Sequence, residues 1–313
     1  MKIRVLGSAA GGGFPQWNCN CRNCAGVRTG ALRARVRTQS SIAVRGGDPR
    51  SGPGHASSWV LVNASPDILV QLRAHEDFQP ARSPRDTGVC AIVLVDGQVD
   101  HTIGLYMLRE SARPLALWCT DAVYADLTRG NPIMEVLAHY CGIERQRMHL
   151  DGAGFAVKGV PGVRWHALPV AGMPAPYSPN RGSPEAGDNV ALLISDERTG
   201  RAVFYAPGLA DVGETAWQAM RSAACVLVDG TFWSDDEMPR LGLSRKRACE
   251  IGHLAQSGTG GMLAWLGRLP AATRKILIHI NNTNPILDED SPERAELGRR
   301  GIEVAWDGME IDL

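Results

Sequence analysis

The sequence lacks the features that would place it in a membrane, in an export pathway or on a nucleic acid. Its 313 residues contain no uninterrupted apolar run of about 18 residues, the length that a membrane-spanning helix needs. The start, Met1 to Gly7, interleaves charged and apolar residues and does not resemble an export signal. Lys plus Arg and Asp plus Glu both number 33, so no basic excess favours nucleic acid. We therefore expect a cytoplasmic protein with no membrane segment and no nucleic-acid partner.

The sequence also lacks the familiar nucleotide-binding loops and any internal repeat. The glycine-rich stretch 11–13 does not have the G-x-G-x-x-G spacing of a dinucleotide site, and no Gly-Lys-Ser/Thr ends it as in a P-loop. No segment repeats at a fixed period, and no change of composition marks a boundary. We expect a single domain over residues 1–313, with loop insertions near 46–57 and 173–187 that are rich in Gly, Pro and Ser. The second loop is long enough to cover a site.

Short apolar runs predict strands that are buried on both faces. They cover residues 3–6, 41–44, 59–62, 90–95, 190–194, 202–205, 225–228 and 276–278. Amphipathic stretches predict helices over 121–128, 133–140, 214–223, 244–254, 259–266 and 292–299, with Ser244 and Ser291 as N-caps. Strands dominate early, and strands and helices alternate later. This order favours an α/β fold of two packed sheets with helices on the outside.

Ionisable side chains follow several of these predicted strands. The run 90–95 leads through Asp96 to Asp100 and His101, the run 225–228 ends at Asp229, and the run 276–278 ends at His279. Strand ends in α/β folds meet where binding sites form, so we expect these side chains to converge. Each residue alone is more typical of a turn or of a hydrogen-bonded core histidine. Together they favour a metal centre, because carboxylate oxygen and imidazole nitrogen suit Zn²⁺ or Fe²⁺.

A compact cysteine cluster predicts a second metal site. Cys19, Cys21 and Cys24 have the spacing Cys-x-Cys-x-x-Cys, and three thiolates this close can surround one structural Zn²⁺. The alternative is three free thiols in a loop, which a reducing cytosol would also permit. Zinc in a closed structural site needs a fourth ligand, for which Asn282, His253 and water are the candidates.

The segment from Asp96 to Gly104 resembles the metallo-β-lactamase motif His-x-His-x-Asp-His-x-x-Gly without its first two histidines. The resemblance implies a metallo-β-lactamase αββα sandwich, in which two mixed sheets pack together between outer helices. It also implies that Asp100, His101, Asp229 and His279 match the residues at the second of the family's two metal ions, with Asp229 at the aspartate that bridges both. Asp229 would here be a fourth ligand or a hydrogen-bonding partner of a ligand. A later histidine of the first metal position is expected near Leu168–Val170, but Ala171 and Gly172 follow there.

These losses predict a centre for a single metal ion. Two histidines with one or two carboxylates approach the facial triad of non-haem iron oxygenases, which leaves positions open for dioxygen and substrate. A lone metal ion without a bridging hydroxide is a poorer catalyst of hydrolysis. We therefore expect Fe²⁺ or Zn²⁺ at the active centre and chemistry other than that of a β-lactamase or nuclease.

The whole chain is similar to the B-protein family of pyrroloquinoline quinone (PQQ) biosynthesis. The stretches that carry the resemblance are residues 7–19, 38–41, 63–67, 96–104, 228–233, 251–254 and 278–285. The resemblance implies an iron- and oxygen-dependent hydroxylase, which acts on the tyrosine ring of a peptide-derived precursor that carries cross-linked Glu and Tyr. Its partners would be this precursor and other proteins of PQQ biosynthesis. The alternatives are a carrier that moves PQQ or its precursor to the periplasm and a metal-dependent hydrolase.

Two further residues are candidates for the catalytic machinery. His253, on a Gly-His turn, would transfer a proton near the metal, although a helix-capping or core histidine is an equal alternative. Asp67, after the Asn63-Ala64-Ser65-Pro66 stretch, would orient a ligand histidine through a hydrogen bond. The oligomeric state is left open, with a homodimer as one option.

Overall fold

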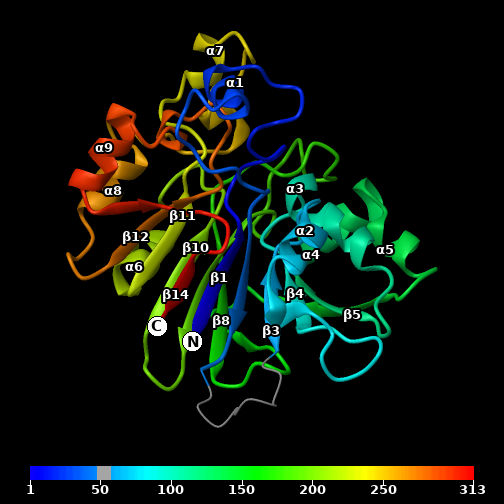
Figure 1. Ribbon diagram of the computed structural model, residues 1–313. Helices are drawn as coiled ribbons and strands as arrows, with labels where there is room; N and C mark the ends of the chain where they lie inside the picture. The colour runs from blue at the N-terminus through cyan, green and yellow to red at the C-terminus, as the bar shows by residue number, and fades with distance from the viewer. Residues whose placement is uncertain (48–57) are drawn as a thin grey trace.

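Two seven-stranded sheets pack face to face in the computed structural model, which describes residues 1–47 and 58–313 (Figure 1). From position 48 onward, the predicted insertion 46–57 lies outside the described residues. The first sheet has the order β14 (Glu310–Asp312), β1 (Lys2–Gly7), β2 (Ser41–Arg45), β3 (Trp59–Val62), β4 (Val89–Val93), β5 (Leu115–Cys119) and β6 (Ile143–Arg147). The second has the order β13 (Ile302–Val304), β12 (Arg274–Ile278), β11 (Cys225–Asp229), β10 (Ala202–Ala206), β9 (Val190–Asp196), β8 (Val163–Pro169) and β7 (Phe155–Ala156).

Helices cover the outer face of each sheet, so the predicted αββα sandwich is confirmed (Figure 1). The first sheet is covered by α2 (Ile68–Arg73), α4 (Asp121–Ala125) and α5 (Ile133–Leu137), and the second by α6 (Glu214–Ser222), α8 (Met262–Gly267) and α9 (Pro292–Arg299). The remaining helices are α1 (Arg22–Thr29), α3 (Val99–Thr102) and α7 (Glu237–Arg240). None of the helices in the described ranges is long and apolar enough to span a bilayer.

The central strands bury side chains on both faces, which explains why they are continuous apolar runs. In β11, Cys225 and Leu227 lie in the core between the sheets, whereas Val226 and Val228 lie in the core beneath α6, α8 and α9. Each strand therefore needs apolar residues at every position rather than at alternate ones. All eight strands predicted from such runs are confirmed, with small shifts at their ends.

Two of the strands that were not predicted, β6 and β8, have a different pattern. The charged strand β6 lies at the edge of its sheet, where one long side faces solvent. In β8, buried and half-buried positions alternate, so no continuous apolar run marks it. The polar helix α1 was missed for a related reason, since only Asn23 and Cys24 are buried in it.

Five of the six helix predictions are confirmed, with shifts at their ends. Helix α9 begins as predicted, with the Ser291 hydroxyl accepting a hydrogen bond from the backbone N–H of Arg294 (3.0 Å). The helix predicted over 244–254 is wrong, because the Ser244 hydroxyl accepts instead from the backbone N–H of Lys246 in a local turn. Only the short 3₁₀ turn η4 (Cys249–Ile251) forms there, and Gly252 ends it at φ +89°.

One edge of the sandwich brings the two sheets together and positions the site. Strands β3 to β6 run parallel to one another, as do β10 to β13, so the carboxyl ends of β4, β11 and β12 reach the same edge. Ala9, just after β1, bridges Gln39 on one side and Ile280 on the other. The chain after β1 thereby ties the ends of both sheets together.

Candidate metal centre

Three side chains from the strand ends converge as predicted. Asp100 and His101 lie in α3, which follows β4, and His279 follows β12 directly. These three residues offer ligand atoms that all lie within 4.8 Å of one another. Asp100 Oδ2 is 3.2 Å from His279 Nε2 and 3.9 Å from His101 Nε2. Two ligands of one tetrahedral ion lie about 3.3 Å apart when each bond is about 2.0 Å, so the spacing suits a metal ion.

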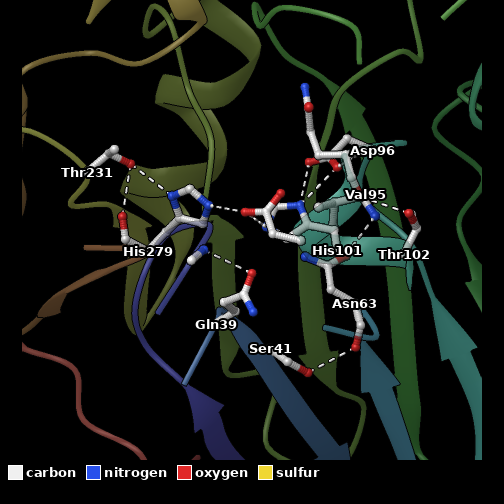
Figure 2. Close-up of polar contacts among 12 residues, drawn as sticks. Gln39, Ser41, Asn63, Val95, Asp96, His101, Thr102, Thr231 and His279 are labelled. Carbon is white, nitrogen blue, oxygen red and sulfur yellow. Dashed lines mark hydrogen bonds and ion pairs between the residues drawn. The ribbon is translucent and has the colours of Figure 1, made fainter. Parts of the chain in front are cut away.

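Hydrogen bonds orient both imidazoles toward the same space (Figure 2). The Nδ1 atom of His101 donates to Asp96, with distances of 2.9 and 2.8 Å to the two carboxylate oxygens. The Thr231 hydroxyl donates to the carbonyl of His279 (2.9 Å) and lies 2.9 Å from its Nδ1, from which it can accept. In each ring this leaves Nε2 to face the other.

The buried Nε2 atom of His101 has no hydrogen-bond partner, although the residue is only 2% exposed. A buried polar atom without a partner costs about 1–3 kcal/mol, so such atoms are rare unless a ligand completes them. A metal ion held by Asp100, His101 and His279 would supply the missing partner. The donor set of one carboxylate and two imidazoles therefore fits Zn²⁺ or Fe²⁺.

Backbone conformation at two strand ends also supports a functional site. Asn63 and His279 are the non-glycine residues with positive φ in the described ranges, at +64° and +61°. They directly follow β3 and β12. Such conformations persist only where the surrounding structure fixes them, and they gather at functional sites.

The residues at the positions of the missing motif histidines make hydrogen bonds within the protein. Asp96 holds His101, and Gln98 Nε2 donates to the carbonyl of Met173 (3.0 Å). At Gly172, a Cβ atom would lie 2.6 Å from the side chain of Asn189, so a larger residue would displace that side chain. The first metal position thus lacks its histidine ligands, and the groups near it have other partners.

The structure changes the role of one predicted residue, Asp67. Asp67 does not orient a histidine, because its Oδ2 accepts from the backbone N–H of Gln39 (2.9 Å) and from Gln39 Nε2 (3.0 Å). That part of the prediction is wrong, and Asp96 has the role instead. The position of Asp96 at the first histidine of the motif was the signal that could have identified it.

Asp229 and His253 form a hydrogen-bonded pair at the end of β11. His253 Nδ1 lies 2.7 Å from Asp229 Oδ2, and the two residues lie together with His279 in a second group of metal-ligating type. His253 lines the pocket of the candidate centre, whose wall consists of Asp96, Gln98, Asp100, His101, Met173, Asn189, Gly208, Ile251, Gly252, His253 and His279. The sequence analysis therefore placed His253 near the centre correctly, but it missed the contribution of Thr231.

Electrostatics explains how the pocket behaves without a cation. Burial alone would lower the pKa of His101, but the charges of Asp96 and Asp100 outweigh this effect and raise it to about 9. Burial would raise the pKa of Asp100, but His101 and the hydrogen bond from His279 hold it below its usual range. The metal-free pocket therefore keeps a proton on His101 at neutral pH.

The cysteine cluster forms a separate site beside Asn282. The sulfur atoms of Cys19, Cys21 and Cys24 lie within 4.8 Å of one another. Asn282 Nδ2 donates to the three sulfur atoms at 3.0, 3.6 and 3.4 Å. As a metal ligand, Asn282 would have to use its amide oxygen, because the NH₂ group is a donor only. His253 is not the fourth ligand, because it lines the pocket of the other centre and lies outside the cysteine group. Asn282 and water remain, and the three-sulfur set suits Zn²⁺.

Comparison with known proteins places the chain in a family. The Beta-lactamase superfamily domain model matches residues 58–280. A coenzyme PQQ synthesis protein B of Azoarcus sp. is 61% identical over 313 residues, which is 100% of both chains. The chain belongs to the coenzyme PQQ synthesis protein B family.

Solved structures agree with this assignment. The Zn²⁺-bound PqqB from Methylobacterium extorquens is 37% identical, with a TM-score of 0.87 over 100% of both chains. A diphosphatase from the PhnP family is 16% identical, with a TM-score of 0.65 over 100% of this chain and 97% of that one. The latter likeness shows a shared fold alone. This member of the PQQ synthesis B family therefore has the β-lactamase-superfamily framework with the altered ligand set described above.

The proton on His101 predicts the pH dependence of metal binding. With a pKa of about 9, His101 must lose a proton when an ion binds at neutral pH. Affinity for Mn²⁺ should therefore rise about tenfold per pH unit from neutral pH and level off above the pKa. Titration of Mn²⁺ at several pH values, with free Mn²⁺ followed by electron paramagnetic resonance (EPR), measures this slope.

Replacement of Asp96 separates this explanation from a general pH effect. Asp96→Asn removes the charge that raises the pKa of His101, so the rise should level off at lower pH, and affinity should fall by about 10–100-fold. Asp67→Asn is the matched control and should keep the wild-type profile, because Asp67 contacts Gln39. An Asp96→Asn profile identical to that of the wild type would contradict the assignment.

The cysteine cluster predicts zinc that resists removal. We expect about one Zn²⁺ per chain to survive dialysis against a weak chelator and to be lost in Cys24→Ser, with a lower melting temperature. Cys249→Ser is the matched control, since Cys249 is exposed and lies outside the cluster. Metal analysis and thermal unfolding measure both effects. Equal zinc content in the two variants would refute a structural zinc at this cluster.

Proposed function

We propose that the protein acts in PQQ biosynthesis as a metal- and dioxygen-dependent hydroxylase of the tyrosine-derived ring in a peptide-derived precursor. Family membership supports the pathway, since relatives such as the Azoarcus protein are named coenzyme PQQ synthesis protein B. The single observation that carries the reaction type is the ligand set of Asp100, His101 and His279 without the histidines of the first metal position.

This ligand set argues for oxygen chemistry over hydrolysis. Hydrolases with two metal ions use the pair to generate and hold a nucleophilic hydroxide and to stabilise the leaving oxygen. Here Asp96 and Gln98 stand where two ligands of the first ion would be, and both have partners within the protein. Two imidazoles and one carboxylate on a single ion leave positions open for dioxygen and for substrate.

The reaction requires a reductant as well as dioxygen. Ring hydroxylation replaces a C–H bond by C–OH, and the second oxygen atom leaves as water after taking up two electrons and two protons. We propose an external two-electron donor of the thiol or ascorbate class for these electrons. Fe²⁺, when bound by Asp100, His101 and His279, would supply the electron transfer that activates dioxygen.

The pocket wall would orient the substrate and limit the access of water. Met173 and Ile251 contribute apolar surface, and Gln98 and Asn189 contribute amides that can hydrogen-bond a polar substrate. The loop 173–187 is anchored at both ends, by Gln98 Nε2 to the carbonyl of Met173 and by the Thr120 hydroxyl to the carbonyl of Gly187 (2.7 Å). We propose that this loop acts as a fixed wall of the pocket.

The test follows the source of the new oxygen atom. Protein loaded anaerobically with Fe²⁺ is mixed with a cross-linked Glu–Tyr substrate, a reductant and ¹⁸O₂. We expect dioxygen uptake and one ¹⁸O atom in the hydroxylated ring, reduced at least about 100-fold in His101→Ala because an ion ligand is lost. His139→Ala is the control, since this exposed histidine lies outside the pocket.

Other outcomes would point to the remaining candidate functions. Cleavage with oxygen derived from water would indicate a hydrolase. Tight substrate binding without dioxygen uptake would indicate a carrier. Full turnover in His101→Ala would show that the assigned centre does not perform the reaction.

A further inference from the structure

We propose that His253 is a fourth ligand of the metal centre through Nε2, and that Asp229 orients His253 instead of binding the ion. This inference rests on the metal-binding part of the proposed function and does not depend on hydroxylation. It gives His253 a ligand's role in place of the proton transfer predicted from the sequence, and it removes Asp229 from the predicted ligands.

Both carboxylate oxygens of Asp229 already accept hydrogen bonds within the protein. It is fully buried, and its Oδ1 accepts from the backbone N–H of Thr231 (2.9 Å). Its Oδ2 accepts from the backbone N–H of Leu209 (3.0 Å) and from His253 Nδ1 (2.7 Å). Asp229 is also absent from the residues that line the pocket. A carboxylate with three donors of its own does not need a cation.

His253 reaches the pocket that Asp229 does not. Its side chain is 17% exposed and lines the pocket wall. Because Nδ1–H donates to Asp229, the Nε2 atom carries the lone pair that a metal would accept. Gly208 also lines the pocket, and a Cβ added there would lie 3.8 Å from His253 Cε1, which is ordinary contact. Gly208 therefore leaves room beside this part of the imidazole.

Packing fixes the orientation of the His253 ring. It stacks on His279, with ring centroids 5.4 Å apart and an interplanar angle of 23°. Phe232 packs edge-on against it, with a centroid distance of 5.9 Å. The turn that presents it depends on Gly252, which has φ +89° and where a Cβ would lie 2.7 Å from the backbone nitrogen of Met173. The two stacked imidazoles thus present their rings side by side.

The three histidines of the pocket share one arrangement. Each has a polar partner at Nδ1, namely Asp96 for His101, Thr231 for His279 and Asp229 for His253. A metal-ligating histidine almost always donates its other ring nitrogen to a carboxylate, a carbonyl or water in this way, which fixes the tautomer. His253 therefore shares the feature that marks His101 and His279 as ligands, which is a polar partner at Nδ1.

The four proposed ligands are spaced less closely than Asp100, His101 and His279 alone. His253 is not part of the group in which Asp100, His101 and His279 lie within 4.8 Å of one another. Binding of one ion by all four side chains would therefore draw them closer together, while the hydrogen bond from His253 to Asp229 is kept. Four donors, three nitrogens and one oxygen, would then surround the ion.

The test counts histidine nitrogens on bound Mn²⁺. Mn²⁺ is a hard ion that favours nitrogen and oxygen donors, so the cysteine cluster can be kept filled with zinc. Pulsed EPR of the wild type should detect three histidine nitrogens, and His253→Ala should show two. Asp229→Asn should keep three, with about 10–100-fold weaker Mn²⁺ binding, and His253→Ala should weaken it further. His139→Ala should match the wild type.

Two results would overturn the inference. One is a wild-type count of two nitrogens, which decides the matter even if the Asp229 variant fails to fold. The other is loss of Mn²⁺ binding in Asp229→Asn with an unchanged nitrogen count in His253→Ala. Neither measurement involves dioxygen or the precursor, so failure here remains separate from failure of the hydroxylase proposal.

Discussion

The hydrogen bond between Asp96 and Nδ1 of His101 determines what kind of centre this fold can hold. Asp96 stands where the superfamily motif has its first metal-ligating histidine, and here the carboxylate turns toward a neighbouring side chain. The bond fixes His101 with Nε2 in the pocket, and Gln98 is held by the carbonyl of Met173. Aspartate in place of histidine at position 96 therefore removes a ligand of the first ion and orients His101, a ligand of the second.

Charge balance links this bond to the need for a cation. Asp96 and Asp100 both lie close to His101, and without an ion their charges keep a proton on its imidazole. A bound metal replaces that proton and is compatible with the hydrogen bond to Asp96, because the bond uses the other ring nitrogen. The cysteine cluster differs, since Asn282 already reaches all three sulfur atoms. An ion there would stabilise the loop around α1, whereas an ion in the pocket would be open to a bound molecule.

The central strands and the residues at their ends could be predicted from the sequence, because strands that are buried on both faces are continuous apolar runs. Strand β4 is apolar at every position, and β11 is apolar up to its last residue, Asp229, since both of their faces are covered. The residues at the ends of these strands reach the shared sheet edge. The sequence could not show which carboxylate faces which histidine. Asp67 and Asp96 both lie near strand ends, but the start of α2 directs Asp67 toward Gln39. The helix predicted from Ser244 does not form, because the Ser244 side chain takes part in a local turn and Gly252 has a positive φ.

The claim that the altered motif leaves one metal position is tested most directly by anomalous X-ray diffraction from crystals grown with Mn²⁺. The account predicts a single anomalous peak in the pocket, bonded to Asp100, His101 and His279. Two peaks about 3.5–4 Å apart in the pocket would contradict it, because that spacing marks a two-metal site.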